Sequence, residues 1–124
     1  MGEIKMVAVF DSNIIIDYFK GIQEAQTTIN KYKHKYISFI TWIECLVKIP
    51  PDRQFIAIEL LSDFNLVTMD EKLMQESLRI RQTTKLKLPD AIILATAWTR
   101  QAKLLTRNSK DFANYDSVII PYQV

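Results

Sequence analysis

Short apolar runs alternate with amphipathic segments along this chain, a pattern that indicates strands followed by helices. The first apolar run, residues 5–10, is rich in β-branched and aromatic side chains. The Asp-Ser-Asn sequence of 11–13 that follows it contains residue types that begin helices. We therefore expect a buried strand and then a helix over 14–19, which Gly21 is placed to end. Four further apolar runs predict strands at 36–40, 65–68, 104–106 and 118–120.

Helices are expected between successive strands among the first four. A polar helix is predicted over 22–35, because the cationic residues that crowd its end suit a helix C-terminus. Thr41 can cap a helix that Pro50 stops, and Asp52 can cap the next helix, which runs to Phe64. Two helices therefore separate the second strand from the third.

The later part of the chain predicts two more helices and a loop. Asp70 can cap the first of these helices, and Pro89 suits the first turn of the second. Residues 91–98 are apolar on nearly every face, so we expect the fold, helped by a partner, to bury this helix. The stretch 107–114 is predicted to be a polar loop.

Strands that alternate with helices at this spacing form parallel β-α-β units with right-handed crossovers. The predicted fold class is therefore α/β, a three-layer sandwich around a parallel sheet of about five strands with Rossmann-like topology. The sequence contains no internal repeat and no linker, so we expect residues 1–124 to form a single domain. In open parallel sheets the functional cleft lies beyond the carboxyl ends of the strands.

Composition narrows the class of protein. The chain has 124 residues, 48% of them hydrophobic, and its apolar runs are much shorter than the roughly 20 residues of a membrane span. Residues 1–9 lack the apolar segment of a signal peptide, which predicts a cytoplasmic location. The single cysteine, Cys45, excludes a Cys-based zinc site and is expected in the core, whereas the single histidine, His34, is expected on the surface. A net charge of +2 is too small to indicate a nucleic-acid partner by itself.

Three acidic residues stand beside apolar segments, where a solvated carboxylate is out of place: Asp11, Glu44 and Asp90. Each also has a simpler structural interpretation. Asp11 can be a helix cap, Glu44 can lie on the solvated side of a helix, and Asp90 gains from a helix dipole. Asn108 and Asp111 follow the fourth strand and can be ordinary loop residues.

What favours a functional site is that all five side chains map to the same edge of one sheet. Carboxylates that converge repel one another unless a cation joins them. Oxygen ligands without Cys or grouped His select Mg²⁺, with Mn²⁺ as the alternative, rather than zinc. Ions held in this way activate water and stabilise phosphoryl oxygens during phosphodiester cleavage.

Four segments also resemble a known family. In order they are Val-Phe-Asp-Ser-Asn-Ile-Ile-Ile-Asp-Tyr-Phe from residue 9, Ile-Thr-Trp-Ile-Glu from 40, Leu-Pro-Asp-Ala-Ile-Ile-Leu-Ala-Thr-Ala from 88, and Leu-Leu-Thr-Arg-Asn-Ser-Lys-Asp-Phe from 104. This order is similar to that of the PIN-domain ribonucleases, in particular the VapC-type toxins of bacterial toxin-antitoxin pairs. The resemblance spans nearly the whole chain.

The resemblance implies a set of site residues. It implies metal ligands at Asp11 and Asp90, an acid at Glu44 that completes the site, and a fourth position after Thr106. Many relatives have Asp where this chain has Asn108, which leaves Asp111 as the nearer acid. Whether the site holds one ion or two stays open. The resemblance further suggests Ser12, Thr106 and Arg107 as supporting residues or phosphate contacts.

The acidic residues and the resemblance together lead us to expect a Mg²⁺-dependent endoribonuclease. The resemblance implies that it is the toxin of a toxin-antitoxin pair and that its products carry a 5′-phosphate and a 3′-hydroxyl. RNA phosphates would be held by basic residues outside the acidic pocket, namely Arg79, Arg81, Lys85, Lys87, Arg107 and Lys110. The expected partners are a cognate antitoxin and a second copy of the chain.

Three other functions are alternatives to this one. A housekeeping RNA-processing nuclease stays open. A non-catalytic PIN-like scaffold that binds RNA or protein is the other alternative, and the intact acids Asp11, Glu44 and Asp90 argue against it. A haloacid-dehalogenase type of phosphate chemistry is disfavoured, because it requires an Asp where this chain has Asn13.

Overall fold

The computed structural model describes residues 6–124, and all five strands lie in one sheet. The strands are β1 (Val7–Phe10), β2 (His34–Ser38), β3 (Asn65–Val67), β4 (Lys103–Leu105) and β5 (Val118–Ile119). Every neighbouring pair is parallel, and the order across the sheet is β3-β2-β1-β4-β5. The predicted parallel sheet is therefore confirmed, and the strand order reverses between β1 and β4.

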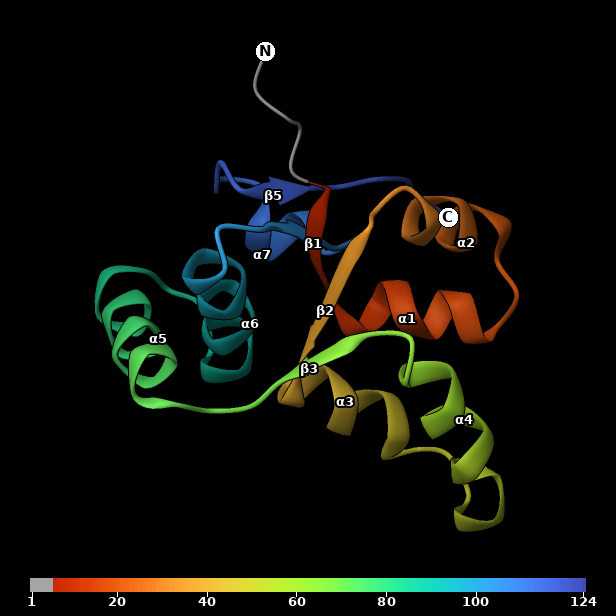
Figure 1. Ribbon diagram of the computed structural model, residues 1–124. Helices are drawn as coiled ribbons and strands as arrows, with labels where there is room; N and C mark the ends of the chain where they lie inside the picture. The colour runs from red at the N-terminus through yellow and green to blue at the C-terminus, as the bar shows by residue number, and fades with distance from the viewer. Residues whose placement is uncertain (1–5) are drawn as a thin grey trace.

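Helices cover both faces of this sheet (Figure 1). They are α1 (Ser12–Phe19), α2 (Gln23–Asn30), α3 (Phe39–Leu46), a 3-10 turn η1 (Pro51–Arg53), α4 (Gln54–Leu61), α5 (Glu71–Thr83), α6 (Leu88–Thr99) and α7 (Ser109–Phe112). The α5–α6 pair packs on one face, whereas α1 and α4 pack on the other. The predicted three-layer sandwich is confirmed.

The side chains of β1 show how the two faces are filled. Val9 packs into a core cluster with Ile80 of α5 and Leu94 of α6, and Phe10 packs into the opposite cluster with Ile14 of α1. Alternate residues of a strand point to opposite faces, so a short apolar run can serve both layers. The next residue after this buried strand is Asp11, which places its carboxylate at the carboxyl edge of the sheet.

Several predicted boundaries were wrong. The helix predicted over 22–35 ends at Asn30, and β2 begins at His34 rather than at 36. The backbone N–H groups of Lys33 and His34 both donate to the Met6 carbonyl, so pairing with the first strand decides the conformation there. Residue 5, which the sequence placed in the first strand, lies outside the described residues.

Two predicted helix caps were also wrong. Ser38 caps α3 by accepting a hydrogen bond from the Ile40 backbone N–H at 3.1 Å, and Thr41 is buried inside the helix. Asp52 lies in the 3-10 turn, and α4 begins at Gln54 without a side-chain cap. Several residue types in each segment can cap a helix, and packing of the helix on the sheet determines which one does.

The loop predicted over 107–114 contains the short helix α7, which Asn108 caps. Other expectations are confirmed: Asp70 caps α5, residues 91–97 of α6 are buried, Cys45 is buried, and His34 is exposed. Among residues 6–124, no helix is both long enough and apolar enough to cross a membrane.

Candidate functional site

Asp11 lies where the strand order reverses, directly after β1 and beside the end of β4. Its backbone N–H donates to the Leu105 carbonyl at 2.9 Å, which joins the ends of the two strands. The side chain is 5% exposed and caps α1 by accepting a hydrogen bond from the Ser12 backbone N–H at 2.8 Å. Burial raises the pKa of Asp11, and its hydrogen bonds to Thr106, Ser12 and Asn13 lower it in part. The carboxylate is thus a helix cap and a candidate metal ligand at once.

Thr106 and Asn13 hold the second oxygen of Asp11. The Thr106 hydroxyl donates to Asp11 Oδ2 at 2.8 Å, and Asn13 Nδ2 donates to the same oxygen at 3.3 Å. Asn13 Nδ2 also donates to Thr106 Oγ1 at 3.2 Å, and Asn13 Oδ1 accepts from the Arg107 backbone N–H at 3.0 Å. These contacts connect the segment after β4 to the start of α1 and fix the orientation of the Asp11 carboxylate.

Glu44 of α3 and Asp90 of α6 bring two more carboxylates toward Asp11. Burial raises the pKa of Glu44, the nearby Ser12 hydroxyl lowers it, and the negative charge of Asp11 raises it. Burial also raises the pKa of Asp90, and the negative charges of Asp11, Asp111 and Glu44 add to this effect, so that it reaches about 6. The acids predicted from the sequence therefore act on one another electrostatically.

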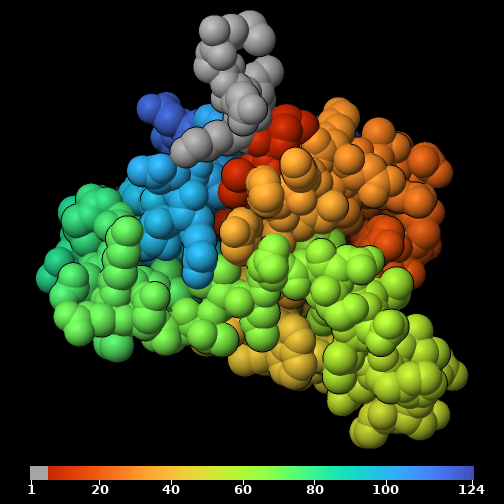
Figure 2. Space-filling model, viewed as in Figure 1, coloured from red at the N-terminus to blue at the C-terminus, as the bar shows by residue number. Residues whose placement is uncertain are grey.

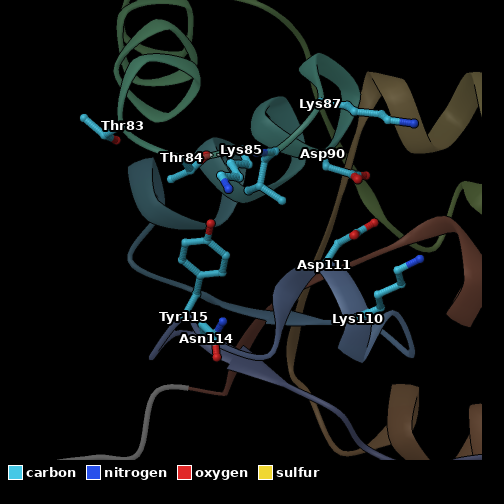
Figure 3. A pocket seen from close by; sticks show the side chains of 10 residues that line it. Thr83, Thr84, Lys85, Lys87, Asp90, Lys110, Asp111, Asn114 and Tyr115 are labelled. Carbon is cyan, nitrogen blue, oxygen red and sulfur yellow. Dashed lines mark hydrogen bonds between the residues drawn. The ribbon is translucent and has the colours of Figure 1, made fainter.

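Asn108 and Asp111 have different positions in this arrangement. Asn108 Oδ1 accepts a hydrogen bond from the Asp111 backbone N–H at 3.2 Å, which caps α7, and Asn108 Nδ2 donates to Asp111 Oδ2 at 3.0 Å. The Asp111 side chain points toward Asp90 in Figure 3 and raises the pKa of that residue. Asp111 thus brings the fourth carboxylate, and Asn108 orients it.

The donor set fits a hard divalent cation. All four acids offer oxygen ligands, and within residues 6–124 none of them takes part in an ion pair. In that same part of the chain, no three acidic, His or Cys side chains already stand close enough together to hold an ion. Glu44 and Asp111 are exposed, so their side chains have room to rotate toward Asp11 and Asp90, and for Asp111 this rotation competes with the hydrogen bond from Asn108 Nδ2.

Three of the six basic residues proposed to contact RNA are engaged within the protein. Arg79 pairs with Glu76 and lies over the Trp98 ring, 5.6 Å from its centroid. Arg81 donates to the Leu86 carbonyl at 2.9 Å. The guanidinium group of Arg107 binds Asp17, with the Arg107 Nε atom 2.6 Å from Asp17 Oδ2.

The other three, Lys85, Lys87 and Lys110, line a pocket of about 530 Å³ together with Asp90 and Asp111 (Figure 3). The pocket lies between the segment that joins α5 to α6 and the region of α7. Lysines therefore surround the acidic cluster on this side of the molecule.

Sequence reasoning missed Asn13, Asp17 and Tyr122. Asp17 is 3% exposed and accepts hydrogen bonds from Arg107 and from the Tyr122 hydroxyl, the latter at 2.8 Å. An acid within the apolar segment 14–19 was a signal that Asp17 needs a buried partner, but the sequence did not identify that partner.

The parallel sheet is doubly wound, and the acidic cluster lies where its strand order reverses. α/β folds of this kind have their functional site at the carboxyl ends of the strands. The PIN domain family model matches residues 8–118 of this chain. The chain therefore belongs to the PIN domain family.

Solved structures agree with this assignment. A toxin-antitoxin complex from Klebsiella pneumoniae contains a chain 42% identical to this one, with a TM-score of 0.89, and the match covers 94% of this chain and 99% of that one. The resemblance to VapC-type toxins is thereby supported. A comparison with curated protein sequences finds no significant match.

More distant structures share the fold. VapBC2 from Rickettsia felis, bound to a DNA fragment from its promoter, contains a chain 17% identical with a TM-score of 0.78, covering 91% of this chain and 96% of that one. FitAcB from Neisseria gonorrhoeae contains a chain 19% identical with a TM-score of 0.77, covering 95% and 100%.

Proposed function

We propose that this protein is a metal-dependent endoribonuclease and the toxin of a toxin-antitoxin pair. The observation that carries the proposal is the acidic cluster at the strand ends, where Asp11, Glu44 and Asp111 raise the pKa of Asp90 and none of the four carboxylates forms an ion pair within residues 6–124. Such a cluster is costly to maintain unless it serves to bind a cation. Membership of the PIN domain family supports the nuclease assignment.

Asp11, Asp90 and Glu44 would hold the ion, and Asp111 would complete the set. When bound, Mg²⁺ or Mn²⁺ would supply Lewis-acid activation of water and would offset negative charge on the phosphoryl oxygens. The buried Asp11 gives the site a fixed ligand, because Thr106 and Asn13 hold its carboxylate. The half-buried Asp90 and the exposed Glu44 leave the site open to a long polymer.

Lys85, Lys87 and Lys110 would contact RNA phosphates on either side of the cut. The Ser12 hydroxyl, which lies near both Asp11 and Glu44, would orient a water or a phosphate oxygen. Arg107 instead has a positioning role, because Asp17 occupies its guanidinium group. Lys85, Lys87 and Lys110 would give affinity for the RNA backbone without selecting a base sequence.

A direct test is cleavage of a mixed RNA pool by the purified protein with Mg²⁺, with EDTA, and with Asp11→Asn or Asp90→Asn. Asn still caps a helix, so the Asp11→Asn variant is expected to keep α1 intact. The matched control is Asp63→Asn, which removes an exposed acid outside the cluster. We expect EDTA and both site variants to abolish cleavage and the control to keep it.

Cleavage that persists in EDTA or in both site variants would overturn the proposed metal site. A wild-type protein that cuts nothing but binds RNA equally well with EDTA would favour the non-catalytic scaffold. Cleavage restricted to one cellular RNA precursor, without growth inhibition, would favour the housekeeping nuclease.

An antitoxin partner and a homodimer are further parts of the proposal. The similar Klebsiella pneumoniae structure is a toxin-antitoxin complex. The η1–α4 segment projects from the body of the protein (Figure 2) and exposes apolar side chains, with Phe55 69% and Ile56 54% exposed. Exposed apolar surface of this kind marks interaction sites. If light scattering shows a monomer at all concentrations, the proposed dimer is contradicted. Because the proposed substrate is RNA, we further propose that the protein acts in the cytoplasm.

A further inference from the structure

We propose that Asp17 holds the Arg107 side chain away from the acidic cluster and thereby keeps the carboxylates of that cluster free to bind a cation. The cluster consists of four acids, Asp11, Glu44, Asp90 and Asp111. This inference rests on the proposed metal site. It gives Asp17, a buried acid that the proposed chemistry does not use, a positioning role that it exerts through Arg107.

The backbone of Arg107 lies beside the acidic cluster. The preceding residue, Thr106, donates to Asp11 Oδ2 at 2.8 Å, and the Arg107 backbone N–H donates to Asn13 Oδ1 at 3.0 Å. The amide of the same Asn13 donates to Asp11 Oδ2 at 3.3 Å, so a single asparagine side chain connects the Arg107 backbone to the Asp11 carboxylate. Because the guanidinium group stands on a stem of methylenes, it is long enough to reach that carboxylate from this position.

The Arg107 side chain instead runs along α1, away from Asp11. Asn13 and Asp17 are four positions apart in α1, so they lie one helical turn apart on the same face. The Arg107 backbone binds the first of these residues, and its guanidinium group binds the second through Nε at 2.6 Å and an Nη atom at 3.2 Å. Asp11 caps the start of α1, whereas the guanidinium group lies further along the helix toward its C-terminal end.

Asp17 is well suited to hold the guanidinium group in this place. Its carboxylate is 3% exposed, and both of its oxygens accept hydrogen bonds from Arg107, an arrangement that a lysine cannot reproduce. The Tyr122 hydroxyl donates to the same carboxylate at 2.8 Å. Burial raises the pKa of Tyr122, so this hydroxyl keeps its proton and remains a donor. Three hydrogen bonds therefore satisfy the buried acid.

Without Asp17, the acidic cluster is the strongest alternative partner for Arg107. Within residues 6–124 the four acids of the cluster form no ion pair, and like charges that gather at one place attract a cation. A guanidinium group binds carboxylate oxygens, which are also the ligands that Mg²⁺ requires. Arg107 and a metal ion would therefore compete for the same oxygens, and the pair with Asp17 prevents this competition.

The first experiment measures Mg²⁺ binding by calorimetric titration of wild type, Asp17→Asn, and the double variant Asp17→Asn with Arg107→Gln. Asparagine has the size of aspartate, but its Nδ2 donor faces the donors of Arg107, so the pair is broken. We expect Asp17→Asn to weaken Mg²⁺ binding roughly tenfold, because the ion must displace a guanidinium group from the carboxylates. The double variant has no guanidinium group at this place, so its affinity should return to within about threefold of wild type.

Three controls separate this effect from net charge and from stability. Asp63→Asn makes the same change in net charge at an exposed site outside the cluster and should leave Mg²⁺ binding unchanged. Asp17→Asn with Lys31→Gln matches the net charge of the first double variant but keeps Arg107, and Lys31 is exposed at the end of α2, so its binding should stay roughly tenfold weaker than wild type. Tyr122→Phe removes a hydrogen bond to Asp17 but keeps the ion pair, so it should lower stability and leave the Mg²⁺ affinity unchanged.

The second experiment locates the Arg107 side chain by NMR in EDTA, so it depends on neither metal nor RNA. In wild type, the Arg107 Nε–H proton should show nuclear Overhauser contacts with the Tyr122 ring, because both groups donate to the same Asp17 oxygen. In Asp17→Asn we expect these contacts to be replaced by contacts with side-chain protons of Glu44 or Asp90.

A milder variant tests the proposal if Asp17→Asn does not fold. Arg107→Lys keeps both charges of the pair but replaces the planar fork with a single ammonium group, which Asp17 holds less firmly. We expect part of the lysine population to turn toward the cluster and to weaken Mg²⁺ binding roughly threefold. Unchanged Mg²⁺ binding in this variant would contradict the role of Asp17.

The proposal is overturned if Asp17→Asn binds Mg²⁺ as wild type does, or if the double variant without Arg107 binds as weakly as Asp17→Asn. Arg107 contacts that stay with Tyr122 in Asp17→Asn would overturn it as well. Failure of the metal site gives a different result. A wild-type protein that binds no Mg²⁺ contradicts the proposed function, whereas the position of Arg107 in EDTA still tests the role of Asp17.

Discussion

The Asp17 carboxylate receives two hydrogen bonds from the Arg107 guanidinium group, at 2.6 Å from Nε and 3.2 Å from an Nη atom. Asp17 lies in α1 and Arg107 in the segment after β4, so this pair joins the two elements that flank Asp11. The Tyr122 hydroxyl donates to the same carboxylate, which also attaches the C-terminal segment. Hydrogen bonding to Asp17 raises the pKa of Arg107, so the guanidinium group stays charged over the accessible pH range.

Replacing Asp17 by Asn is expected to destabilise the protein by about 3 kcal/mol, because it leaves the Arg107 guanidinium group, whose side chain is 25% exposed, without its countercharge. Tyr122→Phe removes one hydrogen bond and should cost about 1 kcal/mol. The free energy of unfolding in urea measures both. The control is Glu76→Gln, which breaks the more exposed pair with Arg79 and should cost under about 1 kcal/mol. If Asp17→Asn and Glu76→Gln lower the free energy of unfolding equally, the buried pair contributes no more to stability than the exposed pair.

Thr106→Val is expected to reduce stability by about 2 kcal/mol, because valine has the same shape but cannot donate to the buried Asp11 carboxylate. The substitution also removes the acceptor for Asn13 Nδ2 and for the Asn108 backbone N–H. Thr106→Ser keeps the hydroxyl and should recover most of the stability and, if the proposed function holds, the cleavage rate. If Thr106→Ser loses as much stability as Thr106→Val, then the methyl group of Thr106, and not its hydroxyl, is what stabilises the protein.

The sequence predicted the parts of this site that follow from strand ends. Asp11 comes after a buried apolar run, and such a run in a parallel sheet necessarily delivers the next residue to the carboxyl edge. Asp90 was found because an acid in the first turn of an otherwise apolar helix is conspicuous. Both predictions depend only on the residues that neighbour the acid in the sequence, and the periodicity of apolar residues describes such local patterns.

The contacts that sequence reasoning missed join residues far apart in the chain. Asp17 and Tyr122 are 105 positions apart, and the local pattern around neither residue identifies the other. The start of β2 at His34 was missed for a similar reason, because it depends on pairing with β1 rather than on the cationic run itself. Helix α7 was missed because its four residues are too few to show a period.

Asn108→Asp tests how the fourth acid is arranged. Aspartate can still cap α7, but it replaces the Nδ2 donor that now holds Asp111 Oδ2 at 3.0 Å with a second negative charge. Without metal, the variant is expected to melt at a lower temperature than wild type at neutral pH. Adding Mg²⁺ should raise its melting temperature more than that of wild type, because the added carboxylate strengthens cation binding.

Two comparisons make the Asn108 result interpretable. Asn108→Ala removes the cap and should cost about 1 kcal/mol with or without Mg²⁺. Calorimetric titration with Mg²⁺ should give tighter binding to Asn108→Asp and weaker binding to Asp111→Asn than to wild type. If Asp111→Asn binds Mg²⁺ as wild type does, Asp111 does not belong to the metal site.

The stability of the metal-free protein should depend on pH through Asp90. Burial and the neighbouring carboxylates raise the pKa of Asp90 from 3.8 to about 6, so the folded protein holds this proton more tightly than the unfolded chain. The stabilisation is fully present below a pH of about 4 and is lost as the pH rises through about 6. In EDTA, the melting temperature of Asp90→Asn should therefore rise relative to that of wild type as the pH increases from about 4.5 to about 7.5.

The control for this prediction is Asp63→Asn, whose melting temperature should keep a constant difference from wild type over the same range. Mg²⁺ should stabilise wild type more at about pH 7.5 than at about pH 4.5, because an ion must compete with the proton on Asp90 at the lower pH. The Asp90→Asn variant loses that competition together with its ligand, so its response to Mg²⁺ should be smaller and should vary less with pH than that of wild type. A wild-type protein whose Mg²⁺ response is also independent of pH would remove Asp90 from the proposed ligand set.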